Sequence, residues 1–329
     1  MSETVTTTPE VKKPELKLTS SPHLHSTWST QKAMWIVVIS ILPALISGVL
    51  FFGLYQLIVV FVSIAGAVLT EYAIKYFRNQ RITITDGSAV ITGLLLGLIV
   101  PPNFSLVLVF LGSVVSIAIG KEVFGGLGYN IFNPALVGRA FLQAAFPVAM
   151  TTWSKPEFAP DAITSATPLS AWKFVDGGEP FFTATENLFY GNIGGSIGET
   201  SALAILLGGA LLFVLKIANW RVPAAMVVGM LVFGGIFHLL NPENYPTPVD
   251  QIFMGGFLFG AIFMATDWVS SPVTNKGMYI YGLGIALIIV MIRLFGGLPE
   301  GVMYAILLMN GFVPLINRYT RPVIFGEEK

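Results

Sequence analysis

The chain has 329 residues, 54% of them hydrophobic and only 11% charged, whereas a soluble domain carries about 25% charged residues, so the composition argues against a water-soluble fold. Its 18 Lys and Arg balance its 18 Asp and Glu, which leaves no electrostatic basis for binding nucleic acid. With no cysteine and only three histidines, the chain supplies no thiolate ligand for an iron–sulfur cluster, and we expect no metal site in it.

The first 32 residues are polar and contain Lys12, Lys13 and Lys17. A signal peptide would place its apolar region nearer the terminus. We therefore expect residues 1–32 to form a cytoplasmic tail.

The rest of the chain is a series of apolar runs that indicates an all-α polytopic membrane protein with about ten transmembrane helices. Some runs, such as 88–100 before Pro101 and Pro102, are too short to cross a bilayer alone and predict tilted, broken or partly buried helices. The expected spans are 33–52, 54–76, 88–100, 105–120, 133–150, 201–215, 222–240, 251–265, 278–295 and 301–317.

The distribution of positive charge predicts the orientation of these spans. Lys and Arg stay preferentially in cytoplasmic loops. With the N-terminus inside, all but four of the 18 Lys and Arg fall on that side or in the tails, the exceptions being Arg139, Lys155, Lys173 and Arg293. Both termini are therefore expected in the cytoplasm, with a C-terminal tail over 318–329 and a long hydrophilic loop over 151–200 on the outer face.

Two short patterns recur about half the chain apart. Gly93-Leu-Leu-Leu-Gly97, which follows Asp86, resembles Gly256-Phe-Leu-Phe-Gly260, which follows Asp250; Phe124-Gly-Gly-Leu127 recurs as Phe295-Gly-Gly-Leu298. Chance recurrence of Gly and Leu explains either match alone, but both together favour two repeats, 33–150 and 201–317. Five spans in each would make the repeats inverted, with a site between them near the midplane.

A glycine- and asparagine-rich stretch over 125–139 stands at the entrance of the fifth span. Such irregular backbone is tolerated in a membrane only where it lines protein or a cavity, and its amides can hold a planar ligand or an ion. Close helix packing through small residues is the alternative. The candidate binding residues are Gly125, Gly126, Asn130, Asn133 and Arg139.

The outer loop contains Asp161-Ala-Ile-Thr164-Ser165-Ala166-Thr167, which by composition is a Ser/Thr-rich turn. It resembles the flavinylation motif of the RnfD and NqrB family, Asp-x-x-(Ser/Thr)-Gly-Ala-(Thr/Ser), whose last residue carries FMN through a phosphoester. The resemblance implies covalent FMN on Thr167, with Asp161, Thr164, Ser165 and Ala166 completing the motif. Ser165 stands where the family usually has glycine.

The stretch over 125–139 also resembles that family's Gly-Gly-x-Gly-x-Asn-x-Phe-Asn-Pro-Ala segment, and Ser21-Pro22-His23 resembles the start of RnfD sequences. The resemblance covers nearly the whole chain. The expected inverted repeat of five spans is similar to the urea-transporter fold. The short N-terminal tail favours the RnfD branch, which belongs to the Rnf complex. The alternative is the NqrB branch, which belongs to the sodium-pumping NADH:quinone reductase and generally has a longer tail.

The resemblance implies a subunit, inactive alone, of a ferredoxin:NAD oxidoreductase that couples electron transfer to Na⁺ or H⁺ transport across the cell inner membrane. It implies partner subunits with iron–sulfur clusters and flavins, and a flavin transferase that attaches FMN. No residue of this chain is expected to act as an acid, base or nucleophile during turnover. By analogy with the quinone reductase, the glycine-rich stretch is also a candidate seat for a second, non-covalent flavin, riboflavin or FMN.

Six ionisable residues lie in or near the spans: Glu71, Asp86, Glu122, Arg139, Asp267 and Arg293. Charges there are costly unless paired, hydrated or functional. Asp86, Asp267 and Glu122 are the candidates for an ion path, with solvated helix ends as the alternative. For Arg139 the expected partner is a carboxylate, a flavin phosphate or a set of helix C-terminal carbonyls.

Two functions from other classes compete with electron transfer. A urea-transporter-like channel predicts a polar path between the halves and no flavin, and fold alone does not decide function. An assembly scaffold predicts an unmodified Thr167. The stretch over 161–167 discriminates between these functions, because a channel has no use for a flavin attachment motif.

Overall fold

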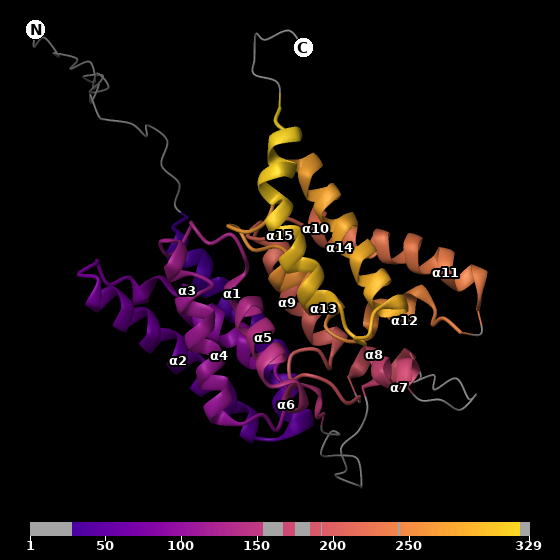
Figure 1. Ribbon diagram of the computed structural model, residues 1–329, viewed down its shortest axis with the longest axis horizontal. Coiled ribbons are helices and arrows are strands. Elements are labelled where there is room, and N and C mark those ends of the chain that lie inside the picture. Colours follow the sequence, from indigo (N-terminus) through magenta and orange to yellow (C-terminus); the bar gives the residue numbers. More distant parts are fainter. Residues whose placement is uncertain (1–27, 154–166, 175–184, 192, 243, 323–329) are drawn as a thin grey trace, which may run out of the picture.

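The computed structural model describes residues 28–153, 167–174, 185–191, 193–242 and 244–322. All regular structure in these residues is helical, as Figure 1 shows, which confirms the predicted all-α class. The first half contains α1 (Thr30–Phe52), α2 (Tyr55–Phe77), η1 (Ile84–Asp86), α3 (Ser88–Ile99), α4 (Leu106–Ala118), η2 (Glu122–Phe124), α5 (Pro134–Ala145) and α6 (Pro147–Thr151).

Two short helices, α7 (Pro168–Phe174) and α8 (Thr185–Tyr190), connect this half to the second. The second half contains α9 (Ala202–Val214), α10 (Arg221–Gly229), the π-helical turn η3 (Met230–Gly234), α11 (Gly235–Leu240), α12 (Pro248–Phe253), α13 (Phe257–Phe259), the π-helical turn η4 (Gly260–Met264), α14 (Asn275–Phe295) and α15 (Val302–Tyr319).

Five helical stretches in the described residues are long and apolar enough to cross a membrane, namely Thr30–Phe52, Tyr55–Phe77, Leu106–Phe124, Arg221–Leu240 and Asn275–Phe295. Two further apolar helices, α3 and α9, are shorter. In α3 every residue except Val90 and Ile91 is buried, as expected of a helix that is packed inside protein. The chain is therefore a multi-pass membrane protein.

Two regions differ from the expected continuous spans. The stretch expected as one helix over 251–265 is divided into α12, α13 and η4, with extended backbone at Met254 and a left-handed φ of 64° at Gly255. The stretch over 133–150 is divided into α5 and α6 at Phe146, directly before Pro147, because proline lacks an N–H and disfavours helical backbone in the residue before it.

The helices of each half pack mainly among themselves. In the first half α2 contacts α3 and α4, and α4 contacts α5; in the second half α10 contacts α14, and α14 contacts α15. The halves lie side by side in Figure 1 and meet where α1 contacts α9 and α5 contacts α15. One continuous hydrophobic core runs through both halves.

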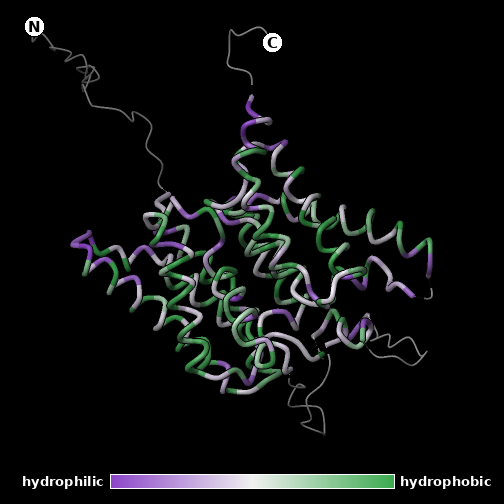
Figure 2. The backbone as a smooth tube through the Cα atoms, viewed as in Figure 1, coloured by the Kyte–Doolittle hydropathy of each residue, from purple (hydrophilic) through white to green (hydrophobic). Residues whose placement is uncertain are grey.

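Large apolar side chains also cover the exterior. Phe61 is 70% exposed, Leu50 64% and Leu207 60%. Figure 2 shows hydrophobic residues along the helices and hydrophilic residues gathered toward their ends. An exterior of this kind is stable in lipid and not in water.

The junction of the halves depends on a close approach at Gly208 in α9. A Cβ atom added there would lie 2.0 Å from the carbonyl oxygen of Ser40 in α1. We expect Gly208→Ala to lower the free energy of unfolding by about 1–3 kcal/mol, because backbone must shift to accept the methyl group. Gly311→Ala in α15 is the matched control, since its nearest atom would lie at 3.8 Å. Thermal unfolding in detergent measures both; equal melting temperatures for the two variants would contradict the prediction.

Candidate functional site

Two of the predicted site residues, Arg139 and Thr167, line one pocket near α6 and α7, which we call the Thr167 pocket. Its walls come from α5, α6, α7, α15 and the loops before α9, α13 and α15. Its other lining residues are Gln143, Met150, Thr151, Trp153, Pro168, Leu169, Ile193, Gly194, Gly195, Glu199, Gly255, Leu298, Pro299, Glu300, Met303 and Tyr304. The pocket thus combines two carboxylates, a guanidinium, an amide and two aromatic side chains.

Thr167 immediately precedes α7 and caps it. Its Oγ1 accepts a hydrogen bond from the Ser170 backbone N at 3.1 Å and lies 2.7 Å from Ser170 Oγ, which satisfies a first-turn N–H that the helix itself leaves free. The other motif residues, Asp161, Thr164, Ser165 and Ala166, lie outside the described residues.

Helix α7 is fixed to the second half by its polar side chains. Lys173 Nζ donates to the carbonyl oxygens of Ile292 at 2.9 Å, Arg293 at 2.8 Å and Leu298 at 2.9 Å. Trp172 Nε1 donates to the carbonyl oxygen of Asn244 at 2.9 Å. Lys173 therefore caps the C-terminus of α14, and partial burial lowers the pKa of its ammonium.

We expect Lys173→Met to loosen α7, because three carbonyl oxygens lose a charged donor at once and such bonds contribute about 1.5–3 kcal/mol. Hydrogen exchange of the α7 amides should become roughly tenfold faster or more. Lys276→Met, which removes an exposed lysine at the other end of α14, should leave α7 unchanged. Unaltered exchange of α7 in Lys173→Met would show that these three hydrogen bonds do not hold the helix.

Arg139 joins the two halves through an ion triad with the buried Glu199 and the partly buried Glu300. Its Nη1 lies 3.1 Å from Glu199 Oε1, and its Nη2 lies 2.9 Å from Glu300 Oε2. Arg139 is 7% exposed and Glu199 6%. Of the three kinds of partner considered for Arg139, the structure therefore shows carboxylates, supplied by two residues.

Two charged side chains, Glu300 of this triad and Arg293, bond the backbone at the break between α12 and α13. Glu300 Oε1 accepts from the Gly256 backbone N at 2.7 Å. The fully buried Arg293 donates to the carbonyl oxygens of Gln251 and, at 2.8 Å, of Met254. Backbone groups freed by a helix break must be satisfied inside a membrane protein, and here two charged side chains do so.

Glu199 occupies the non-helical segment before α9. Burial, together with the neighbouring charge of Glu300, raises the pKa of Glu199 above its ordinary value, although the positive charge of Arg139 acts in the opposite direction. A carboxyl group with a raised pKa in a pocket is a feature of many functional sites.

A second cavity lies between the halves at the opposite end of α5, and we call it the inter-half cavity. The predicted residues Asn130, Asn133 and Asp267 line it. Asn133 Oδ1 caps α5 by accepting from Ala135 N at 3.1 Å, and its Nδ2 donates to the Met264 carbonyl oxygen at 3.2 Å. Burial raises the pKa of Asp267. The further lining of the cavity includes Ser88, Thr92, Lys121, Leu127, Leu212, Phe263 and Trp268.

Gly125 and Gly126 form a left-handed turn after η2, with φ of 117° and 97°. This backbone favours glycine over residues with a Cβ atom. The turn positions the following chain, which lines the inter-half cavity with Leu127 and Asn130. The glycines themselves do not line either cavity.

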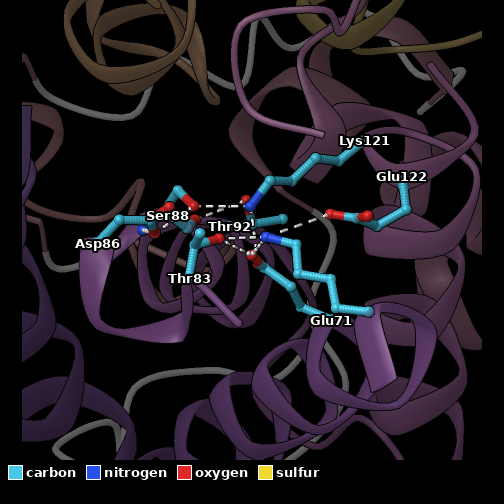
Figure 3. A network of polar contacts seen from close by, with 8 residues as sticks. Glu71, Thr83, Asp86, Ser88, Thr92, Lys121 and Glu122 are labelled. Carbon is cyan, nitrogen blue, oxygen red and sulfur yellow. Dashed lines mark hydrogen bonds and ion pairs between the residues drawn. The ribbon is translucent and has the colours of Figure 1, made fainter. Parts of the chain in front are cut away.

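A buried network of ions, shown in Figure 3, adjoins the inter-half cavity. Glu71, fully buried, lies 2.6 Å from Lys75 Nζ and 2.7 Å from Lys121 Nζ, and Lys121 Nζ also donates to Ser88 Oγ at 2.6 Å. Glu122 lies 4.0 Å from Lys75 Nζ. Two carboxylates and two ammoniums therefore offset one another where α2, α3 and α4 meet.

The candidate ion-path residues are divided between this network and the cavity. Asp86 Oδ1 accepts from Ser88 N at 2.8 Å and from Ser88 Oγ at 2.6 Å. Glu122 Oε1 has no hydrogen-bond partner in the described part of the chain. Asp267 lines the cavity together with Ser88 and Lys121. The fold therefore brings Asp86, Glu122 and Asp267 to one region.

Sequence reasoning missed Glu199, Glu300, Lys121 and Lys173 as members of these sites. The signal available for the first two was an acidic residue at the edge of an apolar span, in Gly198-Glu199 and Pro299-Glu300. Such residues are usually solvated ends. Only the fold brings them to Arg139.

The sequence is similar to those of known proteins along nearly its whole length. A model of the NQR2, RnfD, RnfE family matches residues 17–326. The D subunit of the proton-translocating ferredoxin:NAD(+) oxidoreductase complex of Clostridium ljungdahlii is 44% identical, over 97% of this chain and 99% of that protein.

The D subunit of the Na(+)-translocating ferredoxin:NAD(+) oxidoreductase complex of Acetobacterium woodii is also 44% identical, over 96% of this chain and 97% of that protein. The D subunit of the ion-translocating oxidoreductase complex of Actinobacillus succinogenes is 35% identical, over 94% and 98%. The family match over residues 17–326 spans all the described helices. The chain therefore belongs to the NQR2, RnfD, RnfE family.

Proposed function

We propose that the chain is the RnfD membrane component of an ion-translocating ferredoxin:NAD oxidoreductase, the Rnf complex, and that it carries covalent FMN on Thr167. The observation that carries this proposal is the Thr167 hydroxyl in a pocket with Arg139, Glu199 and Glu300. The names of the relatives, which are subunits of such complexes, support it. Those names also imply other Rnf subunits as partners.

The lining of the Thr167 pocket carries side chains of the kinds that contact a flavin. Trp153 and Tyr304 offer aromatic faces for a planar ring, and Gln143 offers an amide for its polar edge. Gly195 leaves open space, since a Cβ atom added there would meet nothing within 4 Å. A tethered flavin supplies the capacity to accept and pass on electrons singly.

In this proposal the residues of the chain bind and orient the flavin. Thr167 provides the attachment oxygen, and Lys173 holds the helix that follows it. Arg139 keeps Glu199 and Glu300 paired at the wall of the pocket. A separate flavin transferase would use Thr167 once, during maturation. Because the chain has no cysteine, it supplies no thiolate ligand for an iron–sulfur cluster. Cofactors of partner subunits must therefore deliver electrons to it and accept electrons from it.

The inter-half cavity is the proposed seat of a second, non-covalent flavin, riboflavin or FMN. It is bordered by the glycine-rich stretch through Leu127, Asn130 and Asn133. Its mixture of apolar walls with a few amide, hydroxyl and charged groups is typical of cofactor sites. Asp86, Asp267 and Glu122, around the same cavity, are proposed to contribute to the path of the transported Na⁺ or H⁺.

We further propose ten spans in two inverted repeats, 33–150 and 201–317, in the cell inner membrane. The packing supports this, because the two halves repeat one contact pattern. In the first half α2 packs on α4 and α4 on α5; in the second half α10 packs on α14 and α14 on α15. The start of α1 and the end of α15 lie on one side in Figure 1, and α6 and α7 lie toward the other. This supports tails (1–32 and 318–329) in the cytoplasm and the flavin loop (151–200) outside.

The test is in-gel ultraviolet fluorescence of the denatured chain, expressed together with its flavin transferase. The wild-type band should fluoresce and Thr167→Val should be dark, because only a covalent flavin survives denaturation. Thr151→Val removes another hydroxyl from the same pocket and should keep the fluorescence.

Peptide mass spectrometry should find the peptide that contains Thr167 heavier by the mass of FMN less one water, as formation of a phosphoester requires. A dark wild-type band, when a positive-control substrate of the transferase is labelled, would contradict the proposal and favour a channel. Fluorescence that persists in Thr167→Val would place the attachment at another residue.

A further inference from the structure

A groove with two cations opens where α9, α10 and α14 come together at one end of the second half. Its walls include Lys216 and Trp220 from the turn between α9 and α10, and Arg221 at the start of α10. They also include Trp268 and Val273 from the segment before α14, and Met278 from its first turn. Its volume is about 630 Å³, within the range of sites for small molecules. We call it the basic groove.

The two cations of the groove have no acidic partner among the described residues. Lys216 is exposed, and its backbone holds a left-handed φ of 55°, which is uncommon for a residue with a side chain. Arg221 donates to Asn219 Oδ1 at 3.3 Å, and its Cζ lies 5.3 Å from the centre of the Trp220 ring. An amide and an aromatic ring orient the guanidinium without neutralising it, so the groove keeps a net positive charge.

The rest of the groove is apolar and lies at a membrane surface. Phe213 lies in the last turn of an apolar helix, and Met278 belongs to the first turn of a membrane-spanning one. Trp220 and Trp268 are 54% and 50% exposed, and tryptophan concentrates at the level of lipid head groups. Beyond the groove α9 exposes further apolar side chains, so an apolar surface continues from it along the helix.

We propose that the basic groove binds one anionic phospholipid, with the phosphate between Lys216 and Arg221 and the acyl chains along α9 and α14. Positive pockets between membrane helices attract anionic head groups, and the apolar walls distinguish an amphiphile from a free anion. The lipid packs against the wall of the inter-half cavity, because four residues line both spaces: Ile217, Ala218, Thr266 and Trp268.

Native mass spectrometry of the assembled complex in nanodiscs tests the proposal. The nanodiscs contain equal amounts of phosphatidylglycerol and phosphatidylethanolamine. The wild type should retain phosphatidylglycerol in preference, and Lys216→Gln/Arg221→Gln should lower that preference about thirtyfold, because each cation near a membrane surface contributes roughly fivefold. Arg318→Gln/Arg321→Gln removes two exposed charges outside the groove and should retain the preference.

Three results would overturn the proposal. An equal loss in both double variants would mean that general surface charge attracts the lipid. Displacement of the lipid by inorganic phosphate would identify a free-anion site. Retention of lipid by the isolated chain but not by the complex would show that a partner covers the groove. Because neither cation of the groove is buried, melting temperatures of the variants should match the wild type and separate binding from folding.

Discussion

Replacing Arg139 by methionine is expected to lower the free energy of unfolding by about 3–5 kcal/mol, the usual effect of removing one partner of a buried ion group. The guanidinium is the common partner of Glu199 at 3.1 Å and Glu300 at 2.9 Å. Without it two carboxylates face each other with little solvent to separate them. The break before α13 should also weaken, since Glu300 holds Gly256 N.

The loss in Arg139→Met should depend on pH in a defined direction. The pKa of Glu199 is already raised in the wild type, and removal of the positive charge raises it further. A carboxyl group with a raised folded-state pKa binds its proton more tightly when folded, so its contribution to stability falls as pH rises above its unfolded pKa, about 4.3. The variant should therefore be least stable at alkaline pH and recover part of the loss toward pH 5.

Thermal unfolding in detergent between pH 5 and pH 9 measures this effect. Arg139→Lys, which keeps the charge but cannot donate to both carboxylates in a fork, should fall between the wild type and Arg139→Met. Arg318→Met, at the exposed end of α15, should change stability by less than about 0.5 kcal/mol. A loss in Arg139→Met that is the same at every pH would mean that packing, and not uncompensated charge, is the cause.

Local patterns predict the parts of this site that adjoin one another in sequence. The apolar runs locate the helices, Asn133 before Pro134 locates the start of α5, and the stretch ending in Thr167 predicts the attachment residue. Each of these signals lies within a few residues of the feature it describes. They required no knowledge of which helices are neighbours.

Contacts between distant residues could not be predicted in this way. Glu199 and Glu300 are 60 and 161 residues from Arg139, and both lie at span edges, where acidic residues are normally solvated. The break at Gly255 could not be predicted for the same reason, because the residues that stabilise it are distant in sequence. A continuous apolar stretch predicts a continuous helix unless another part of the chain caps the freed backbone, and here Arg293 and Glu300 do so.

Glu71→Gln is expected to have an effect of similar size at the other end of the fold, about 3–5 kcal/mol. Glu71 is fully buried, and it accepts from Lys75 at 2.6 Å and from Lys121 at 2.7 Å. A neutral amide accepts from only one of its two terminal atoms. The variant thus leaves two buried ammoniums without the carboxylate they share, and Lys75 keeps only Glu122, at 4.0 Å, as an ion-pair partner among the described residues.

The double variant Glu71→Gln/Lys121→Met separates charge imbalance from packing. If the buried charge of Lys121 causes the loss, its removal together with Glu71 should restore more than about 1 kcal/mol relative to the sum of the two single variants. Additive losses would contradict this and assign the effect to shape. Urea unfolding of the three variants in detergent measures the free energies of this double-mutant cycle.

The same cycle also connects the ion network to the inter-half cavity. Lys121 lines that cavity and donates to Ser88 Oγ at 2.6 Å, and Ser88 lines it too. Because Glu71 fixes the position of the Lys121 ammonium, Glu71→Gln should alter the polar lining of the cavity as well as stability. Faster hydrogen exchange in the first turn of α3, in Glu71→Gln but not in Thr151→Val, would detect that change; unchanged exchange would confine the role of Glu71 to charge balance.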